Sequence, residues 1–287
     1  MKPIYKKVLI GLLIIIVIIA VFLYMGGKKK ILWLYWDKEE LPHTIHLIKQ
    51  YNQKNIKSWD VRYINNKNIK DYIPREAYPE KYGDLVSANK SDWLRLYIIY
   101  NYGGCWLDMG VIINDSRRFN DIYDNHVKNS SEITFFKTVK HDGYFSKNGT
   151  RLPLVVDSWY ILANRHSSII KQWLDEFTYA TNLGLLNYKR KVLSEGTDLS
   201  HIYFKNEEDT YLSVHICIQY ILQKKLTVLP KITFIDSADS MFKLQGLCNW
   251  EDRCLADKLL NDPLSKQLPF IKLTSSNRTH NIDGFFM

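Results

Sequence analysis

The chain has 287 residues, enough for one large domain or two small ones, and its 46% hydrophobic, 14% aromatic and 24% charged residues exclude an intrinsically disordered protein. Its 13 glycines, 8 prolines and 4 cysteines exclude a collagen-like chain and a small fold held together by disulfides. Six of the nine net positive charges are lysines within residues 1–30, so the rest of the chain carries only three and lacks the charge excess of a nucleic-acid-binding protein.

The first element is an apolar run from Val8 to Tyr24 that contains no charged residue. As a helix, its 17 residues would extend for about 26 Å, enough to cross a thin bilayer. Lysines flank the run, and it lacks the small residues that mark the cleavage site of a signal peptide, which is the alternative. We therefore expect residues 1–30 to be the anchor of a single-pass membrane protein, with a transmembrane helix at about residues 8–25, and residues 31–287 to form the functional domain.

The sequence leaves open on which side of the membrane this domain lies, because the lysines are balanced around the apolar run. Cys248 and Cys254 lie close together around Trp250, and they could form a disulfide in an oxidising compartment or remain two buried thiols. We expect the glycosylation sequons to be chance matches in a chain rich in Asn and Ser. They begin at Asn89, Asn114, Asn129, Asn148 and Asn277.

After the anchor, the hydrophobic pattern predicts a strand at Ile31–Trp36, a helix at about His43–Asn52 and a second strand at Trp59–Ile64. This order favours a layered α/β domain. Further strands are predicted at residues 105–107, 111–113, 133–137, 158–163 and 226–229, and further helices at residues 84–102, 167–179 and 209–224. Gly103 stands where a helix C-terminal glycine would, and Asp108 stands at the end of a short buried strand.

The segment Ser91–Ile113 holds the candidate chemistry. Asp92 and Arg95 are three residues apart on the predicted helix and project from one face, and the Gly103–Gly104 turn returns the next strand, with Asp108, beside it. Two carboxylates and an arginine that can bind hydroxyls and phosphate suit a metal-bound sugar diphosphate. The alternative is an ion pair on a helix surface and an aspartate that merely ends a strand.

The sequence resembles the capsular polysaccharide synthesis protein family, the DXD-containing sugar transferases of glycosyltransferase family 32 and, more distantly, the glucosylating domains of large clostridial toxins. Four segments carry the resemblance: ILWLYWDKEELP at 31–42, SDWLRLYIIYNYGGCWLDMGVII at 91–113, SWYILANRHSSII at 158–170 and PFIKLT at 269–274. The resemblance implies a GT-A type fold, which is a doubly wound α/β domain with a mostly parallel sheet.

By motif position, the resemblance implies that Asp92 and Arg95 hold the donor sugar and its diphosphate, and that Asp108 is a catalytic residue and the first acid of the DXD element. Tyr35 or Trp36 would line the nucleotide pocket. Trp33 and Trp36 could equally be core residues, and Tyr35 shares a strand face with Trp33.

The chain departs from the DXD pattern because the second acid is replaced by Gly110. A Mg or Mn ion could still be held by Asp108, diphosphate oxygens and water, with Asp115, Asn114 or His280 as a further ligand. If the protein proves inactive, Gly110 is the residue to change to Asp.

The resemblance implies a retaining transferase that moves a hexosyl unit from a nucleotide sugar to a glycan, polysaccharide or glycolipid acceptor. The divalent ion and Arg95 would neutralise the charge that develops on the departing diphosphate. Asp157 is a candidate for the acceptor site. The alternative function is an inactive membrane-tethered protein of the same fold that binds a sugar nucleotide or a glycan.

Overall fold

The computed structural model describes residues 30–137, 156–226, 230–238 and 240–287, and residues 31–287 form one compact unit. The predicted transmembrane helix at residues 8–25 lies outside the described residues. Within the described ranges, no helix combines the length and the apolar character needed to cross a membrane. The anchor therefore stays a prediction from the sequence.

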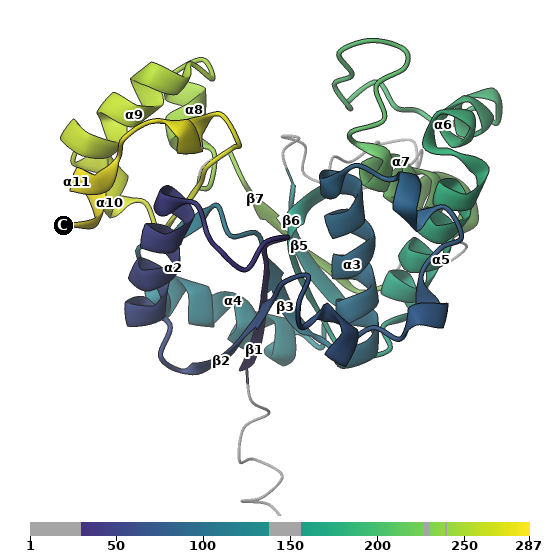
Figure 1. Ribbon diagram of the computed structural model, residues 1–287, viewed down its shortest axis with the longest axis horizontal. Helices are drawn as coiled ribbons and strands as arrows, with labels where there is room; N and C mark the ends of the chain where they lie inside the picture. The colour runs from purple at the N-terminus through teal and green to yellow at the C-terminus, as the bar shows by residue number, and fades with distance from the viewer. Residues whose placement is uncertain (1–29, 138–155, 227–229, 239) are drawn as a thin grey trace, which may run out of the picture. The chain divides into compact units, whose positions relative to one another are not determined.

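A six-stranded sheet forms the centre of the domain, with the strand order β2-β1-β3-β6-β5-β7 (Figure 1). Its strands are β1 (Lys30–Tyr35), β2 (Trp59–Ile64), β3 (Gly104–Leu107), β5 (Ile133–Lys137), β6 (Val156–Ala163) and β7 (Ile232–Asp236). β1 is parallel to β3 and β5 is parallel to β7, whereas β6 is antiparallel to both β3 and β5. β1, β3, β5 and β7 thus run in one direction, and β6 runs in the opposite direction between β3 and β5. The predicted α/β domain with a mostly parallel sheet is confirmed, and the reversed β6 makes the sheet mixed.

Helices cover both faces of this sheet. The α-helices of the described residues are α2 (His43–Asn55), α3 (Ser87–Tyr102), α4 (Ser116–Lys128), α5 (Ser168–Leu183), α6 (Leu185–Ser194), α7 (Ser213–Tyr220), α8 (Lys243–Leu247), α9 (Asp252–Asn261), α10 (Leu264–Gln267) and α11 (Asp283–Phe286). Figure 1 shows α3, α5 and α7 on one side of the strands and α2 and α4 on the other. Side chains alternate accordingly along the strands, because Trp33 and Trp106 pack into the first layer and Leu32 and Cys105 into the second.

Trp33 is a core residue and is fully buried. Its indole Nε1 donates a hydrogen bond of 2.8 Å to the Gly103 carbonyl, and its ring packs against Tyr72 and Tyr102. Because no part of the ring faces an opening, stacking on a nucleotide base is excluded for Trp33. Tyr35 belongs to the same core layer, as the alternation along β1 predicts.

The turn after α3 depends on two glycines. Gly103 (φ 67°) ends the helix and Gly104 (φ 95°) begins β3, both in the left-handed region that favours glycine. A Cβ atom at Gly104 would lie 2.8 Å from the carbonyl oxygen of Ile31, so β3 can approach β1 only without a side chain there. The predicted helix end is confirmed, and the turn returns the chain to the sheet beside α3.

Two predicted elements differ from the structure. The predicted helix from Asp209 begins at Ser213, because the Asp209 carboxylate accepts hydrogen bonds from the backbone amides of Lys205 and Tyr211 and holds a loop instead. Of the predicted strand at residues 226–229, the last three lie outside the described residues. The strand that the structure describes next in the chain is β7, at the edge of the sheet beside β5, and its half-buried residues give a weak sequence signal.

Two short strands, β4 (Val111–Ile113) and β8 (Phe270–Lys272), form a separate antiparallel pair next to the main sheet. β4 follows Asp108 closely in the chain, and β8 comes from the C-terminal region. In their register Val111 pairs with Lys272. This pairing brings the PFIKLT segment beside the end of β3.

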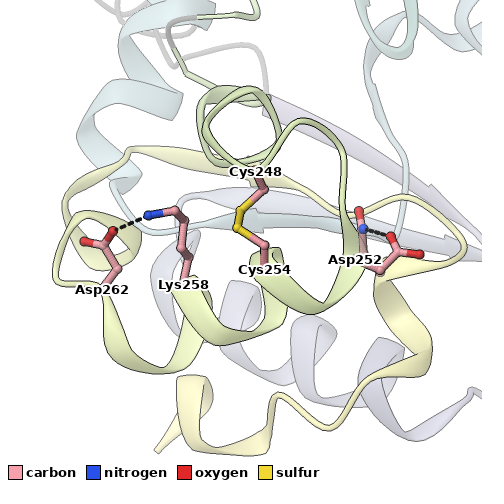
Figure 2. Close-up of a disulfide and its surroundings, with 6 residues drawn as sticks. Cys248, Asp252, Cys254, Lys258 and Asp262 are labelled. Carbon is pink, nitrogen blue, oxygen red and sulfur yellow. Dashed lines mark hydrogen bonds and ion pairs between the residues drawn. A yellow bond between two sulfur atoms is a disulfide. The ribbon is translucent and has the colours of Figure 1, made fainter.

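A disulfide joins Cys248, just after α8, to Cys254 in α9 (Figure 2). The sequence left a disulfide and two thiols open, and the structure has the disulfide. Asp252, in the same loop, accepts hydrogen bonds from Ser276 Oγ at 2.9 Å and Asn277 Nδ2 at 2.5 Å. The disulfide therefore braces a loop that holds the segment after β8.

Replacing both cysteines by serine is expected to lower the free energy of unfolding by about 2 kcal/mol, because the bond closes a short loop in the unfolded chain. Thermal unfolding followed by circular dichroism measures the change. Dithiothreitol should lower the midpoint of the wild-type protein and leave that of the double variant unchanged. Equal midpoints for wild type and variant under oxidising conditions would contradict the prediction.

Candidate active site

The site lies at the carboxyl ends of β1 and β3. These strands are parallel neighbours, and the chain leaves β1 through α2 on one face of the sheet and enters β3 after α3 on the other. Such a point, where the winding direction changes, opens a crevice in which α/β sheets bind ligands. Trp36 follows β1 and Asp108 follows β3, so both lie at the carboxyl ends of these two strands.

Arg95 is the centre of the site and is 5% exposed. Its Nη2 lies 3.2 Å from Asp92 Oδ1 and 3.4 Å from Asp108 Oδ1. Its Nη1 donates a hydrogen bond of 2.7 Å to Ser158 Oγ on β6. The structure thus brings together the three residues that the sequence placed near one another. Since Asp92 and Arg95 are both buried, the alternative of an exposed ion pair on a helix surface is excluded.

Asp108 is partly open to solvent at the end of β3, with 27% of its side chain exposed. Its Oδ1 accepts a hydrogen bond of 3.1 Å from Trp106 Nε1, and its Oδ2 accepts one of 2.9 Å from Lys272 Nζ. Burial raises the pKa of Asp108, but the positive charges of Lys272 and Arg95 outweigh burial and hold the pKa well below the usual range. Asp108 is therefore ionised near neutral pH.

Asp92 differs from Asp108 although the two acids share Arg95. Burial raises the pKa of Asp92 to about 6, and the opposing effect of the Arg95 charge is smaller. The Asp108 charge adds to the rise, whereas a hydrogen bond from Asn89 lowers the pKa. Asp92 is thus ionised near neutral pH and gains a proton in mildly acidic solution.

Replacing Asp92 by Asn is expected to raise the free energy of unfolding at pH 8 by about 1 to 3 kcal/mol and to weaken donor binding. The folded protein binds the Asp92 proton more tightly than the unfolded chain does, so the wild type loses stability as the pH rises from 3.8 to about 6. The asparagine avoids this loss because it resembles the protonated acid. Urea unfolding at pH 5 and pH 8 measures the difference, and an unchanged pH dependence in the variant would contradict it.

The two aromatic residues expected at the nucleotide pocket are the last residue of β1, Tyr35, and the residue that follows it, Trp36. Tyr35 is half-buried, its hydroxyl donates a hydrogen bond of 3.1 Å to Asn66 Oδ1, and burial raises its pKa to about 12. Trp36 is half-buried as well, and the Cζ atom of Arg278 lies 5.4 Å from the centre of its ring. Their part in nucleotide binding stays a prediction.

Asp157 is buried on β6, where it pairs in register with Phe136 on β5. It directly precedes Ser158, the hydrogen-bond partner of Arg95. Its expected place at an acceptor site is a prediction that the geometry leaves untested.

The residues expected to supply a further metal ligand have structural partners or stand apart from Asp108. Asn114 donates hydrogen bonds to the carbonyls of Ser265 and Leu268, both at 2.8 Å. Asp115 caps the N-terminus of α4 by accepting hydrogen bonds from two backbone amides. His280 follows the short turn Asn277–Thr279 and belongs to no ligand cluster among the described residues.

The donor atoms around Asp108 do not fit a divalent ion. In the described ranges, no three His, Cys, Asp or Glu side chains are grouped so that they could hold a metal. Both oxygens of Asp108 already face N–H donors, two of which belong to the cations Arg95 and Lys272. Mg and Mn prefer oxygen ligands and are repelled by positive side chains, so this carboxylate is bound as the partner of cations.

Sequence analysis missed two residues of the site, Lys272 and Arg278. Lys272 is the only charged residue of PFIKLT, and a single charge in a segment that carries the resemblance could have marked it as a site residue. Arg278 had no signal, because it lies outside the four segments that carry the resemblance and reaches the site only through the turn Asn277–Thr279. The cavity between α6 and residues 197–208 contains none of the site residues.

The chain is similar to known proteins over most of its length. The family described as "Capsular polysaccharide synthesis protein" matches residues 24–283. O-glycosyltransferase PaGT of Phomopsis amygdali is 23% identical over 172 residues, which cover 53% of this chain and 39% of the relative. Glycosyltransferase afumC of Aspergillus fumigatus (strain CBS 144.89 / FGSC A1163 / CEA10) is 27% identical over 168 residues, covering 50% and 39%. The match thus spans about two fifths of the length of these curated relatives.

Two solved structures are similar to the chain at low sequence identity. The PaToxG glycosyltransferase has a TM-score of 0.42 at 12% identity, covering 90% of this chain and 85% of its own. A glycosyltransferase involved in the glycosylation of the major capsid of PBCV-1 has a TM-score of 0.46 at 11% identity, covering 90% and 98%. At these TM-scores the likeness adds nothing to the fold derived from the strand order.

Proposed function

This chain belongs to the capsular polysaccharide synthesis protein family, and on that premise we propose that it is a glycosyltransferase that moves a hexosyl unit from a nucleotide sugar to a glycan, polysaccharide or glycolipid acceptor. Both curated relatives carry glycosyltransferase names, which supports the proposal. The observation that carries it is the buried Arg95 between Asp92 and Asp108, at the carboxyl ends of two parallel strands. This is where an α/β sheet binds a nucleotide-linked ligand.

In the proposed reaction, different residues of the site bind different parts of the donor. The Asp92 carboxylate accepts hydrogen bonds from sugar hydroxyls, and the Arg95 guanidinium binds the diphosphate. The bond between the anomeric carbon and the diphosphate breaks, and the departing diphosphate gains negative charge. The acceptor hydroxyl oxygen bonds to the anomeric carbon, and its proton passes to the departing diphosphate. Arg95 stabilises this charge from a fixed position, because Ser158, Asp92 and Asp108 hold its guanidinium in place.

The finer parts of the proposal come from the sequence. Trp36 lines the nucleotide pocket and Asp157 borders the acceptor. The resemblance implies retention at the anomeric carbon, which the anomer of the first product formed would reveal by NMR. Residues 1–30 anchor the protein as a single-pass membrane protein, supported by the uncharged run Val8–Tyr24.

The test is release of free nucleotide from a panel of UDP, GDP and CMP sugars by the purified full-length chain, in EDTA and in Mn or Mg. We expect release from one donor, and we expect Arg95→Lys to lower it at least about 100-fold, because lysine cannot reach several partners with one planar group. Arg117→Lys is the matched control, since the Arg117 side chain is 91% exposed.

Binding of a sugar nucleotide without any release would overturn the proposal and favour the inactive binding protein. If the Arg95→Lys variant released nucleotide as fast as the wild type, Arg95 would have no essential role in the reaction. Unchanged release by Arg117→Lys shows that any loss in Arg95→Lys comes from the position of Arg95 rather than from exchanging an arginine for a lysine elsewhere in the protein.

A further inference from the structure

Three cations from separate parts of the chain meet around Asp108. Arg95 comes from α3, Lys272 from β8, and Arg278 from the turn Asn277–Thr279. Arg95 and Lys272 form ion pairs with Asp108 at 3.4 Å and 2.9 Å, and the charge of Arg278 also acts on Asp108. The carboxylates that form ion pairs with these cations are Asp92 and Asp108, so three cations meet two acids.

Gly110 occupies the position of the second acid in the DXD pattern, and the backbone packed around it leaves no room for a carboxylate side chain. Its carbonyl accepts a hydrogen bond of 2.7 Å from the Leu273 amide, as the strand pairing of β4 and β8 continues. A Cβ atom at Gly110 would lie 2.7 Å from the Leu273 carbonyl oxygen and 3.6 Å from Arg278 Cδ. Where the DXD pattern has its second acid, this chain therefore has packed backbone and an arginine side chain.

Arg278 is held in a fixed position with donors to spare. Its Nε donates a hydrogen bond of 3.1 Å to the Thr274 carbonyl, and its guanidinium lies over the ring of Trp36. Thr274 is bound in turn by Asn277, which Asp252 holds from the disulfide loop. The two terminal nitrogens of Arg278 make no hydrogen bond to any described residue. A preorganised guanidinium with unused N–H groups is suited to bind phosphate oxygens.

Lys272 also has unused donors. Its ammonium group has three N–H bonds, and its hydrogen bond to Asp108 is the only one that its side chain makes to the described residues. The side chain is 12% exposed, so its charge is weakly screened by water. A second negatively charged ligand could bind Lys272 while Asp108 stays in place.

We propose that Lys272 and Arg278, together with Arg95, bind the diphosphate of the donor directly, so that this chain binds and uses its nucleotide sugar without a divalent ion. The inference rests on the proposed function and identifies the charge partners of the same site. The negative charges of a diphosphate complement the excess of cations. A divalent ion would have to separate Lys272 from Asp108 and would lie close to the positive charges of Arg95 and Arg278.

Isothermal titration of UDP and GDP into the full-length chain tests the inference, first in EDTA and then in Mn or Mg. We expect one of the two nucleotides to bind in EDTA, with a dissociation constant that added metal changes by less than about threefold. Lys272→Met and Arg278→Met should each weaken binding about 10- to 100-fold, because each removes charge-assisted hydrogen bonds to phosphate. Lys272→Arg and Arg278→Lys should restore most of the affinity, whereas Arg117→Met should leave it unchanged.

Binding that requires Mn or Mg would overturn the inference and leave the proposed function standing. Unchanged affinity in both methionine variants would also overturn it. If the folded wild type binds neither nucleotide under any condition, the inference fails, and the nucleotide-release panel, which also contains CMP sugars, decides the proposed function separately. Should Lys272→Met fail to fold because it breaks an ion pair, Arg278→Met decides, since Arg278 forms no short ion pair among the described residues.

Discussion

Replacing Asp108 by Asn is expected to lower turnover about 100-fold while the protein binds UDP or GDP at least as tightly as the wild type. Asp108 competes with the diphosphate for the charges of Lys272 and Arg95, so its removal leaves more positive charge for the ligand. Turnover falls because Asp108 also holds these two cations in place. Nucleotide release gives the rate, and isothermal titration in EDTA gives the affinity.

The same variant separates the two interpretations of Asp108. If Asp108 were the main protein ligand of a metal, Asp108→Asn would weaken nucleotide binding in Mn and leave binding in EDTA unchanged. Acid unfolding is the structural control. Because the pKa of Asp108 is lowered in the folded protein, its ion pairs stabilise the fold above the ordinary pKa of 3.8 and lose this effect as the pH falls further. The variant should lack that acid-dependent loss.

Changing Gly110 to Asp, the substitution that would complete the DXD pattern, is expected to destabilise the protein by about 1 to 3 kcal/mol and to produce no metal-dependent activity. The added Cβ would lie 2.7 Å from the Leu273 carbonyl oxygen, so the pairing of β4 with β8 would have to shift. That shift would move Lys272 away from Asp108. Urea unfolding measures the stability, and nucleotide release with and without Mn measures the activity.

Two variants serve as controls for Gly110→Asp. Gly110→Ala adds the Cβ without the charge and should cost a similar free energy if the close approach of the backbone is the cause. Gly83→Asp adds the same side chain at an exposed position where a Cβ meets no atom within 4 Å, and it should have little effect. A Gly110→Asp protein of wild-type stability that gains activity with Mn would show that a metal site can be rebuilt here.

The sequence by itself determined the local elements of this domain. The strands at Trp59–Ile64, Val111–Ile113 and Ile133–Lys137 lie where hydrophobic pattern and turn residues predict them. The end of α3 is set by Gly103, because only a residue that tolerates a positive φ can turn the chain there. Asp92 and Arg95 lie on one face of α3 because of helical spacing, and their side chains form an ion pair. These features depend on residues close together in the chain, so a local pattern is enough to predict them.

Only the tertiary structure decided which charges surround Asp108. Lys272 lies 164 residues away in the sequence and reaches Asp108 through the pairing of β4 with β8. Arg278 reaches Gly110 through a turn that the disulfide loop holds in place. Strand pairing at long range depends on packing and register, which no local pattern specifies. The expectation of a metal ion came from a motif read along the chain, whereas the partners of Asp108 in space are cations.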